Sequence, residues 1–489
     1  MSLLLLLPLL APLAAATLTA LVGWRRFTAW AGVAAAATIL GCGITLATRI
    51  TSTPRIRFGT LLRADALTVT MLIVIGSVAT LSCWAGVGYL DADLVAGRTT
   101  AHRARLYGVL VAAFLTAMSL AVLANDLGVA WVAIEATTIA TAFLVGHRNT
   151  RAALEATWKY VIICSVGIAF AFLGTVLLYF AARHAGAGGS ALALDTLRAH
   201  ATHLDAGVTR LASGLLLVGY GTKAGLVPFH TWLADAHSQA PAPVSALMSG
   251  VLLSVAFSAL LRIKSIADIA LGPGFLRTGL LIVGLATVLI AASLLVGQRD
   301  LKRLLAYSSM ENMGLIAIAA AAGTRLAIAA LLLHVLAHGI AKTVLFLSAG
   351  QLQHAHGGST RISDIAAVLA RSRLLGIAMS SGILVLLALP PFATFASELS
   401  IARGLADAHL GWALAPLLLL LAVAFAALVA TTARILLGRP ATDQPAIAVP
   451  RTAAIALVLG VTASVTLGLT AGPLTHLFRL AATALGAAS

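Results

Sequence analysis

Charged residues are scarce in this sequence: Asp, Glu, Lys and Arg together make up 10% of its 489 residues, while 60% are apolar. Soluble domains carry about 25% charged residues. A soluble core of this length could not bury so much apolar surface, which excludes proteins built on a large aqueous domain. The chain is therefore predicted to be an integral membrane protein.

Cysteine is equally sparse. Cys42, Cys83 and Cys164 stand alone within apolar runs and form no CxxC motif, which excludes an iron–sulfur cluster, a zinc site and a disulfide framework. The glycine-rich stretch from Gly219 to Gly225 departs from the dinucleotide-binding fingerprint by one residue and lies within an apolar helix rather than after a strand. We therefore expect neither a cofactor nor a metal ion in this chain.

Acidic residues are half as numerous as basic ones, and the formal net charge is +16. Such an excess can indicate nucleic-acid binding, but that function needs a clustered basic face on a soluble module. Here the basic residues occur singly or in short groups between apolar runs, as at Arg25-Arg26. This pattern is typical of residues that anchor helix ends at the lipid headgroups, so no nucleic-acid partner is expected.

Long apolar runs are what the sequence has in abundance. At about 20 residues per crossing, the chain has room for about 14 transmembrane helices, which predicts an all-α polytopic membrane protein. We expect N-terminal transmembrane helices over residues 1–104, a functional core over residues 105–405, and C-terminal transmembrane helices with a short interfacial tail over residues 406–489.

Prolines interrupt two of these runs in similar ways. Pro228 follows the run that holds Lys223, and the pair Pro390-Pro391 precedes Glu398. A proline inside a crossing frees backbone carbonyls that only protein or a water-filled cavity can satisfy. Broken helices in both halves of a membrane protein indicate inverted repeats with an ion or substrate site at each break. We expect two inverted five-helix repeats, helices four to eight and nine to thirteen, each containing a broken helix.

Four ionisable residues lie inside apolar runs, namely Glu135, Lys223, Lys342 and Glu398. Together they would cost on the order of 10–14 kcal/mol if all were central and unpaired. They could form structural ion pairs that hold the bundle together, or they could form a path for protons or ions. The path is favoured because 27 of the 32 basic residues are Arg, yet Lys occupies these buried positions. Arg stays protonated in proteins, whereas a buried Lys can release its proton.

The segment around His338 adds a second pattern. His334, His338 and Lys342 are spaced i, i+4 and i+8, which places them on one face of a helix. Groups about 6 Å apart can pass a proton through one or two waters. A metal site is the alternative, but it would need a third ligand and usually a nearby carboxylate. The spacing therefore favours a proton relay.

The most specific pattern runs from Lys223 to Pro241 and reads KAGLVPFHTWLADAHSQAP. It resembles the KAGxxPxHxWLxDAHxxAP signature of the antiporter-like proton-translocating subunits of respiratory complex I, Mrp cation/proton antiporters and membrane-bound group 4 hydrogenases. Further matching stretches extend the resemblance over about residues 105–405. They lie around Glu135, from Asp300 to Gly314 and from Ala337 to Lys342. Within this superfamily the sequence is most similar to hydrogenase-4 component F, on the stretches around Glu135, from Ala153 to Tyr160 and from Ser308 to Glu311.

The resemblance implies roles for the ionisable residues. Glu135 would pair with Lys223 as a charge switch. His334 and His338 would relay protons, and Glu398 would be the exit-side carrier. Further candidates for proton translocation are Lys159, His230, His237, Glu311 and Lys342.

The resemblance also implies a function: a proton-translocating membrane subunit of a redox-driven complex, resembling membrane-bound hydrogenase-4 or NADH:quinone oxidoreductase, in the cell inner or plasma membrane. Its partners would be other membrane subunits and a peripheral redox arm, and the chain itself would hold no redox site. A subunit of a cation/proton antiporter, or of a proton-coupled inorganic-carbon uptake complex, is the alternative. A solute carrier or a passive scaffold is disfavoured, because Lys, His and Glu flank the breaks.

Two positions depart from the family pattern. Many relatives carry a Lys or His in the middle of the eighth helix, where this chain has Ser254, and a His on the tenth helix, where it has Asn312. Neither side chain titrates near neutral pH. A central relay would therefore need water, Glu311 or the His334 face to bridge the gap.

Overall fold

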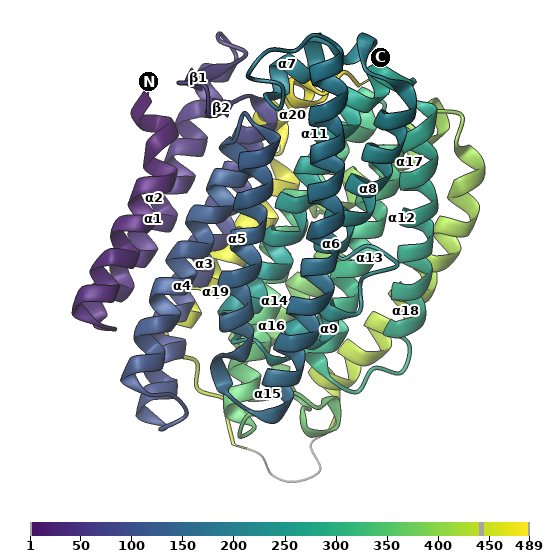
Figure 1. Cartoon of the computed structure of the whole chain (residues 1–489). Helices are drawn as coiled ribbons and strands as arrows, with labels where there is room; N and C mark the ends of the chain where they lie inside the picture. Colours follow the sequence, from purple (N-terminus) through teal and green to yellow (C-terminus); the bar gives the residue numbers. More distant parts are fainter. Residues whose placement is uncertain (1, 440–444, 488–489) are drawn as a thin grey trace.

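The computed structural model describes residues 2–439 and 445–487, and most of these residues form long, roughly parallel helices (Figure 1). Residues 440–444 and 488–489 of the expected C-terminal region lie outside the described residues. The first half of the chain contains α1 (Ser2–Val22), α2 (Arg26–Ile50), β1 (Ile56–Phe58), β2 (Leu62–Ala64), α3 (Ala66–Val95), α4 (Ala101–Leu123), α5 (Leu127–Val145), η1 (Gly146–Arg148), α6 (Arg151–His184), α7 (Leu194–Ala199), η2 (Ala201–His203), α8 (Ala206–Lys223) and α9 (Trp232–Gln239).

The second half of the chain continues in the same way. It contains α10 (Ala242–Leu247), the π-helical turn η3 (Met248–Leu252), α11 (Leu253–Leu271), α12 (Gly274–Leu295), α13 (Leu301–Ala322), α14 (Arg325–Ala355), η4 (Ile362–Asp364), α15 (Val368–Arg371), α16 (Arg373–Leu386), α17 (Ala393–Asp407), η5 (Gly411–Ala413), α18 (Leu414–Leu437), α19 (Arg451–Leu469) and α20 (Gly472–Ala484).

The two ends of the bundle differ in what they carry. In Figure 1 the upper end holds both chain termini, the β1–β2 hairpin, α7 and α20, and the lower end holds α15. Short polar side chains start many of the long helices. Asp65, Asp126, Asp205 and Asp300, for example, each accept a backbone N–H in the first turn of the helix that follows. These caps explain why the apolar runs begin as helices where they do.

Twelve helices of the described residues are long and apolar enough to cross a membrane. Two further crossings are broken. One is formed by α8 and α9, which are separated by residues 224–231, and the other by α16 and α17, which are separated by residues 387–392. The prediction of about fourteen crossings, two of them interrupted at prolines, is therefore confirmed.

Two matching backbone bridges relate the halves of the protein. At the upper end Asp126, which precedes α5, pairs with Ala193, which follows α6. At the lower end Asp300, which precedes α13, pairs with Arg361, which follows α14. Two backbone hydrogen bonds of 2.7–3.0 Å flank each bridge. The same connection thus occurs at opposite ends of the bundle, as expected if helices four to eight and nine to thirteen are inverted repeats.

The most buried helices come from the middle of the sequence. The crossing over Ala242–Leu271 is buried throughout, and α13 and α14 are almost entirely buried. By contrast, α1 and α18 form the edges of the bundle and expose most of their apolar side chains. The centre therefore lies where α10–α11, α13 and α14 meet, and this is where the buried ionisable groups gather.

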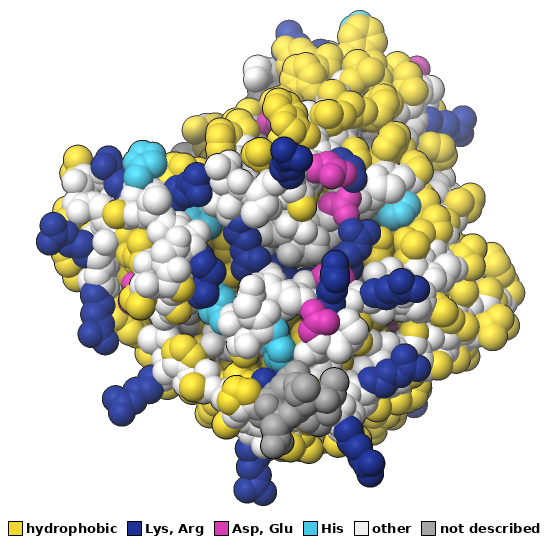
Figure 2. Space-filling model, turned by 90° about the horizontal axis from the view of Figure 1, so that it is seen from below, with side chains coloured by type: hydrophobic (Ala, Val, Ile, Leu, Met, Phe, Trp, Pro, Cys, Tyr) yellow, Lys and Arg dark blue, Asp and Glu magenta, His cyan; other side chains and the backbone are white. Residues whose placement is uncertain are grey.

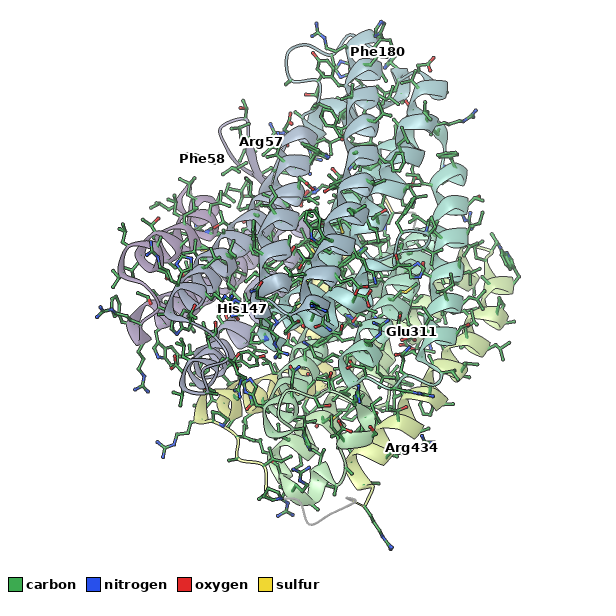
Figure 3. The ribbon with its side chains drawn as sticks, turned by 60° about the horizontal axis from the view of Figure 1, so that its bottom comes forward. Arg57, Phe58, His147, Phe180, Glu311 and Arg434 are labelled. Carbon is green, nitrogen blue, oxygen red and sulfur yellow. The ribbon has the colours of Figure 1, made fainter. Side chains whose placement is uncertain are left out.

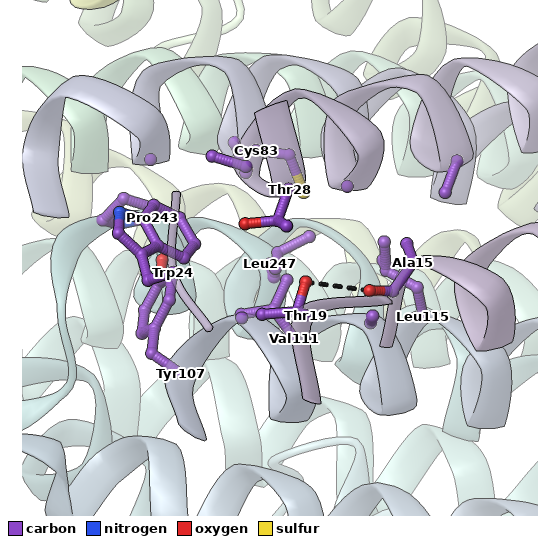
Figure 4. A pocket seen from close by; sticks show the side chains of 17 residues that line it. Ala15, Thr19, Trp24, Thr28, Cys83, Tyr107, Val111, Leu115, Pro243 and Leu247 are labelled. Carbon is purple, nitrogen blue, oxygen red and sulfur yellow. Dashed lines mark hydrogen bonds between the residues drawn. The ribbon is translucent and has the colours of Figure 1, made fainter. Parts of the chain in front are cut away.

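A cavity between the N-terminal helices lies apart from these groups. It has about 30 Å³ accessible to the centres of water molecules and is bordered by α1 to α4 and by Pro243 and Leu247 of α10 (Figure 4). Its walls are mostly small or apolar, and its hydroxyl groups include Thr19, which donates to the Ala15 carbonyl at 2.8 Å. No Asp, Glu, Lys, Arg or His is among the described residues that line it.

Candidate functional site

The first group of polar residues is built around Lys223, the last residue of α8. Its side chain is buried, and its Nζ donates to the Tyr160 hydroxyl at 2.5 Å and to the Thr138 hydroxyl at 2.9 Å. Thr138 in turn donates to Glu135 Oε2 at 2.9 Å. Glu135 and Lys223 are therefore connected through a hydroxyl, and in the described chain Lys223 has no carboxylate within 4.0 Å.

Tyr160 extends this chain of hydrogen bonds. Its oxygen accepts from Lys223 and lies 2.5 Å from the Thr141 hydroxyl. Thr141 donates to the Thr137 carbonyl at 2.6 Å, so the Tyr160 O–H is the donor towards Thr141. Every partner of Lys223 is thus neutral, and each partner is itself held by a hydrogen bond. The ammonium group has acceptors but no fixed counter-ion.

The break after Lys223 follows from the local sequence. Gly225 adopts a φ of 77°, which favours glycine, and Pro228 has no N–H to continue a helix. The Trp232 indole donates to the Thr222 carbonyl at 3.0 Å, and the Thr287 hydroxyl accepts the Val227 N–H at 3.1 Å. Backbone groups that the break frees are therefore satisfied by protein, as a crossing in lipid requires.

The second group is built around Glu311, which lies within the bundle on α13 (Figure 3). The Asn312 amide donates to Glu311 Oε2 at 3.0 Å and to the Ser308 carbonyl at 2.7 Å. Because the amide nitrogen of Asn312 donates to two acceptors, the orientation of the amide group is fixed. The amide oxygen of Asn312 therefore lies 2.8 Å from His334 Nε2. This His334 nitrogen must therefore carry a proton.

The second ring nitrogen of His334 contacts the second broken crossing. His334 Nδ1 lies 2.9 Å from the hydroxyl of Ser397 on α17. The next residue in the chain is Glu398, which is half-buried. One imidazole thus links the tenth crossing to the half-helix that carries Glu398. Asn312 stands between Glu311 and His334 as a hydrogen-bonded link that does not itself titrate.

Lys342 lies two turns beyond His334 on the same face of α14. It is completely buried, and its Nζ donates to the Leu305 carbonyl at 2.9 Å and to the Ser308 hydroxyl. Ser308 therefore contacts Lys342 through its hydroxyl and Asn312 through its carbonyl. Lys342 and Lys223 resemble each other, since each ammonium group is bound by neutral oxygens.

Two histidines in the centre have no protein partner. Both ring nitrogens of His237 and of His338 are buried and unpaired within the described residues, as is the Ser254 hydroxyl. The rings of His338 and His334 are nearly parallel, with centroids 6.3 Å apart, while His237 stacks on Phe346 at 5.5 Å. Buried polar groups of this kind are normally satisfied by water.

The remaining candidates, Lys159 and His230, lie outside the two hydrogen-bonded groups. Lys159 is half-exposed and pairs with Glu155 at 2.6 Å and with Asp235 at 3.2 Å, and Asp235 also binds Arg303. His230 lies in the loop between α8 and α9. Charged side chains of both signs gather on the lower face of the bundle together with histidines (Figure 2). Lys159 is therefore near an aqueous surface rather than in the buried chains.

Sequence reasoning missed two residues of these chains, Thr138 and Tyr160, and one further buried lysine, Lys302. Thr138 follows Glu135 by one helical turn, and this i, i+3 spacing was a usable signal. Tyr160 contacts Lys223 from another helix, which no spacing reveals. Lys302, in the first turn of α13, is fully buried and donates to the Ala240 carbonyl at 2.5 Å. In the described chain no three His, Cys, Asp or Glu side chains are arranged to hold a metal ion.

Both the sequence and the fold of this chain are similar to those of known proteins. Residues 124–426 match the family model described as "NADH:quinone oxidoreductase/Mrp antiporter, TM". A hydrogenase-4 component F homolog from Methylacidiphilum infernorum is 37% identical over 343 residues, which cover 70% of this chain and 71% of the relative.

Two solved structures share the fold. One is a chain of the membrane-bound sulfane sulfur reductase, an archaeal respiratory membrane complex, with a TM-score of 0.88 and 23% identity over 99% of this chain and 98% of that one. The other is a chain of respiratory complex I from Thermus thermophilus, with a TM-score of 0.76 and 25% identity over 97% of this chain and 99% of that one. The fold is thus that of membrane subunits in multisubunit complexes.

Proposed function

Because this chain belongs to the NADH:quinone oxidoreductase/Mrp antiporter family of membrane subunits, we propose that it translocates protons within a redox-driven complex similar to membrane-bound hydrogenase-4 or NADH:quinone oxidoreductase. The observation that carries the proposal is the hydrogen-bonded chain from the half-buried Glu135 through Thr138 to the buried Lys223. Residues 105–405 form the translocating core, and residues 1–104 and 406–489 flank it. The chain works with other membrane subunits and with a peripheral arm that performs the redox chemistry.

This chain of hydrogen bonds acts as a charge switch. When Glu135 holds the Thr138 hydroxyl, Thr138 presents its oxygen to Lys223 and the ammonium form is favoured. When Glu135 is neutralised or withdrawn, the ammonium group keeps only neutral partners in a buried site, which favours release of its proton. Lys342 is held in the same way and takes part as a second lysine carrier.

The released proton moves through the centre to the second break. His237 and His338 have no hydrogen-bond partner among the described residues, and water completes the route between the two groups. His334 then connects the route to Ser397 and so to Glu398, the exit-side carrier. Glu311 lies beside this route and is joined to it by Asn312. His230 and Lys159 lie outside these groups, and they exchange protons with water.

The identity of the complex can be tested directly. Purifying the tagged chain under mild conditions and identifying its neighbouring subunits by mass spectrometry should recover electron-transfer subunits of the hydrogenase or complex I type. Recovery of antiporter subunits alone would select the cation/proton antiporter. Recovery of an inorganic-carbon uptake partner would select that assembly instead, and either result would contradict the redox-driven function.

The role of Glu135 predicts a difference between two substitutions. Glu135→Gln should lower proton translocation by about tenfold or more, because a hydrogen bond to a charged group is worth about 1.5–3 kcal/mol. Glu135→Asp keeps the charge and should retain part of the activity. Proton uptake by the assembled complex in proteoliposomes measures both variants. Equal activity of the Gln and Asp variants, each assembled normally, would remove the switch from the mechanism.

Thr138→Val should lower translocation by roughly tenfold to hundredfold, because it removes the hydroxyl that joins Glu135 to Lys223 and a hydrogen bond to a charged group is worth about 1.5–3 kcal/mol. Thr137→Val is the matched control, since the Thr137 hydroxyl donates only to the Ile134 carbonyl one turn back. The same proteoliposome measurement applies. If both variants lose activity equally, the loss reflects packing in α5 and not the bridge.

A further inference from the structure

Arginines gather at the upper end of the bundle, away from the proton route. Asp195 of α7 accepts from Arg55 at 3.0 Å, from Arg57 at 2.6 Å and from Arg63 at 3.1 Å. The β1–β2 hairpin, which carries Arg57, projects from this end (Figure 3). One carboxylate thus holds three guanidinium groups, which come from the hairpin and the segment before it.

A second carboxylate lies beneath the first. Asp65 accepts from Arg63 at 2.7 Å and from two nitrogens of Arg262 at 2.8 and 3.0 Å, and it also caps α3 through the Thr68 N–H at 2.9 Å. Burial by itself would raise the pKa of Asp65, but Arg262 and Arg63 hold this pKa well below its usual value. Asp65 is therefore ionised, and its oxygens are fully occupied.

The positive charge at this end exceeds the negative charge. The arginines concerned are Arg55, Arg57, Arg63, Arg198 and Arg262, so a net charge of +3 remains even when Asp65 and Asp195 are both counted as negative. Arg63 is more than nine-tenths buried, and its Nε has no hydrogen-bond partner in the described part of the chain. The cluster therefore has more buried N–H donors than the protein has acceptors for.

Four of these arginines line a small cavity, with about 20 Å³ accessible to the centres of water molecules, which we call the arginine pocket: Arg55, Arg63, Arg198 and Arg262. Asp65 and several apolar side chains, including Leu67 and Ile266, complete its wall. The last turn of α20 closes it, where the Arg198 guanidinium donates to the Ala484 carbonyl. The pocket is thus basic on one side, apolar on another, and located where the helices reach the membrane surface.

We propose that the arginine pocket binds a phosphate group, supplied by the headgroup of an anionic phospholipid or by free phosphate. A phosphate offers several acceptor oxygens to the planar guanidinium fork, which matches the excess of donors. Basic pockets between transmembrane helices bind anionic headgroups in this way, and apolar side chains beside the arginines suit the first carbons of a lipid. This site is independent of the proposed proton route.

The test is ligand binding by the purified full-length chain in a neutral detergent. Thermal unfolding is followed with added phosphatidylglycerol, with phosphatidylcholine, and with sodium phosphate at an ionic strength matched by sodium chloride. Phosphatidylglycerol should raise the unfolding midpoint and phosphatidylcholine should not. A rise with sodium phosphate alone would identify free phosphate as a sufficient ligand, and no such rise would identify the lipid headgroup.

Two double variants with the same loss of charge make the test specific. Arg55→Gln with Arg198→Gln removes two guanidinium groups from the pocket and should weaken the apparent affinity about tenfold or more. Arg57→Gln with Arg434→Gln is the control, because Arg57 contacts Asp195 without lining the pocket and Arg434 lies on α18. Equal weakening in both variants, or no response of the unaltered chain to either phosphate source, would overturn the proposal.

Discussion

Lys223→Arg should abolish proton translocation while the complex still assembles. The site binds the ammonium group through the Tyr160 and Thr138 hydroxyls, with no carboxylate in direct contact. An arginine could keep the charge and one or both hydrogen bonds, but it does not release a proton in proteins. A side chain that cannot release its proton cannot pass it on. Because coupled transport must move each proton against the membrane potential, at about 2.3 kcal/mol per 100 mV, it stops when this carrier stays charged. We expect a loss of at least about a hundredfold.

Proton uptake into proteoliposomes under redox turnover measures this loss. Lys264→Arg is the matched control, because Lys264 pairs with Asp268 at the end of α11 and lies outside the proposed route. That variant should translocate protons normally. A Lys223→Arg complex that pumps at the rate of the unaltered protein would show that Lys223 is not a carrier.

Replacing both His334 and His338 by Ala should also abolish translocation without preventing assembly. His334 joins Asn312 on the tenth crossing to Ser397 on the second broken helix, and no other described side chain makes both contacts. Without it, a proton would cross this segment as an unpaired charge, which costs roughly 2.5–3.5 kcal/mol. The expected loss is therefore roughly hundredfold.

A second variant separates proton transfer from packing. His334→Gln can still form hydrogen bonds with Asn312 and Ser397 but does not titrate, so it should lose activity nearly as fully as the double alanine variant. His184→Ala serves as the control, because His184 ends α6 at the upper end and bonds only to the Phe180 carbonyl. Normal pumping by the double variant, together with a dry barrier between Lys223 and His334 in a high-resolution map, would favour separate half-channels.

The number of crossings and the family could be predicted from the sequence alone. Apolar runs of sufficient length determine crossings, and prolines interrupt them, because both effects act within one segment. The signature from Lys223 to Pro241 indicated the family that the comparisons show. The lysines and glutamates inside apolar runs were also recognisable as candidates, because placing a charge in an apolar membrane-spanning run costs free energy whatever the helix packs against.

The partners of these residues were decided by the tertiary structure. The family resemblance implies that Glu135 pairs with Lys223, and in the structure the Thr138 hydroxyl lies between them. Asn312 was read as a gap in the relay, yet it holds Glu311 and His334 together. Contacts of this kind join residues that are up to 85 positions apart in the chain, and helical periodicity gives the face of a helix but not its neighbour.

The arginine pocket likewise depends on the tertiary structure and not on the sequence alone. The sequence shows Arg55, Arg63, Arg198 and Arg262 as separate basic residues near helix ends, where each alone is typical of a headgroup anchor. Only the folded chain brings them around Asp65, since Arg262 and Asp65 lie 197 positions apart. Local composition determines which segments enter the membrane. Packing of distant segments determines which charges meet, because electrostatic contacts depend on distance in space and not along the chain.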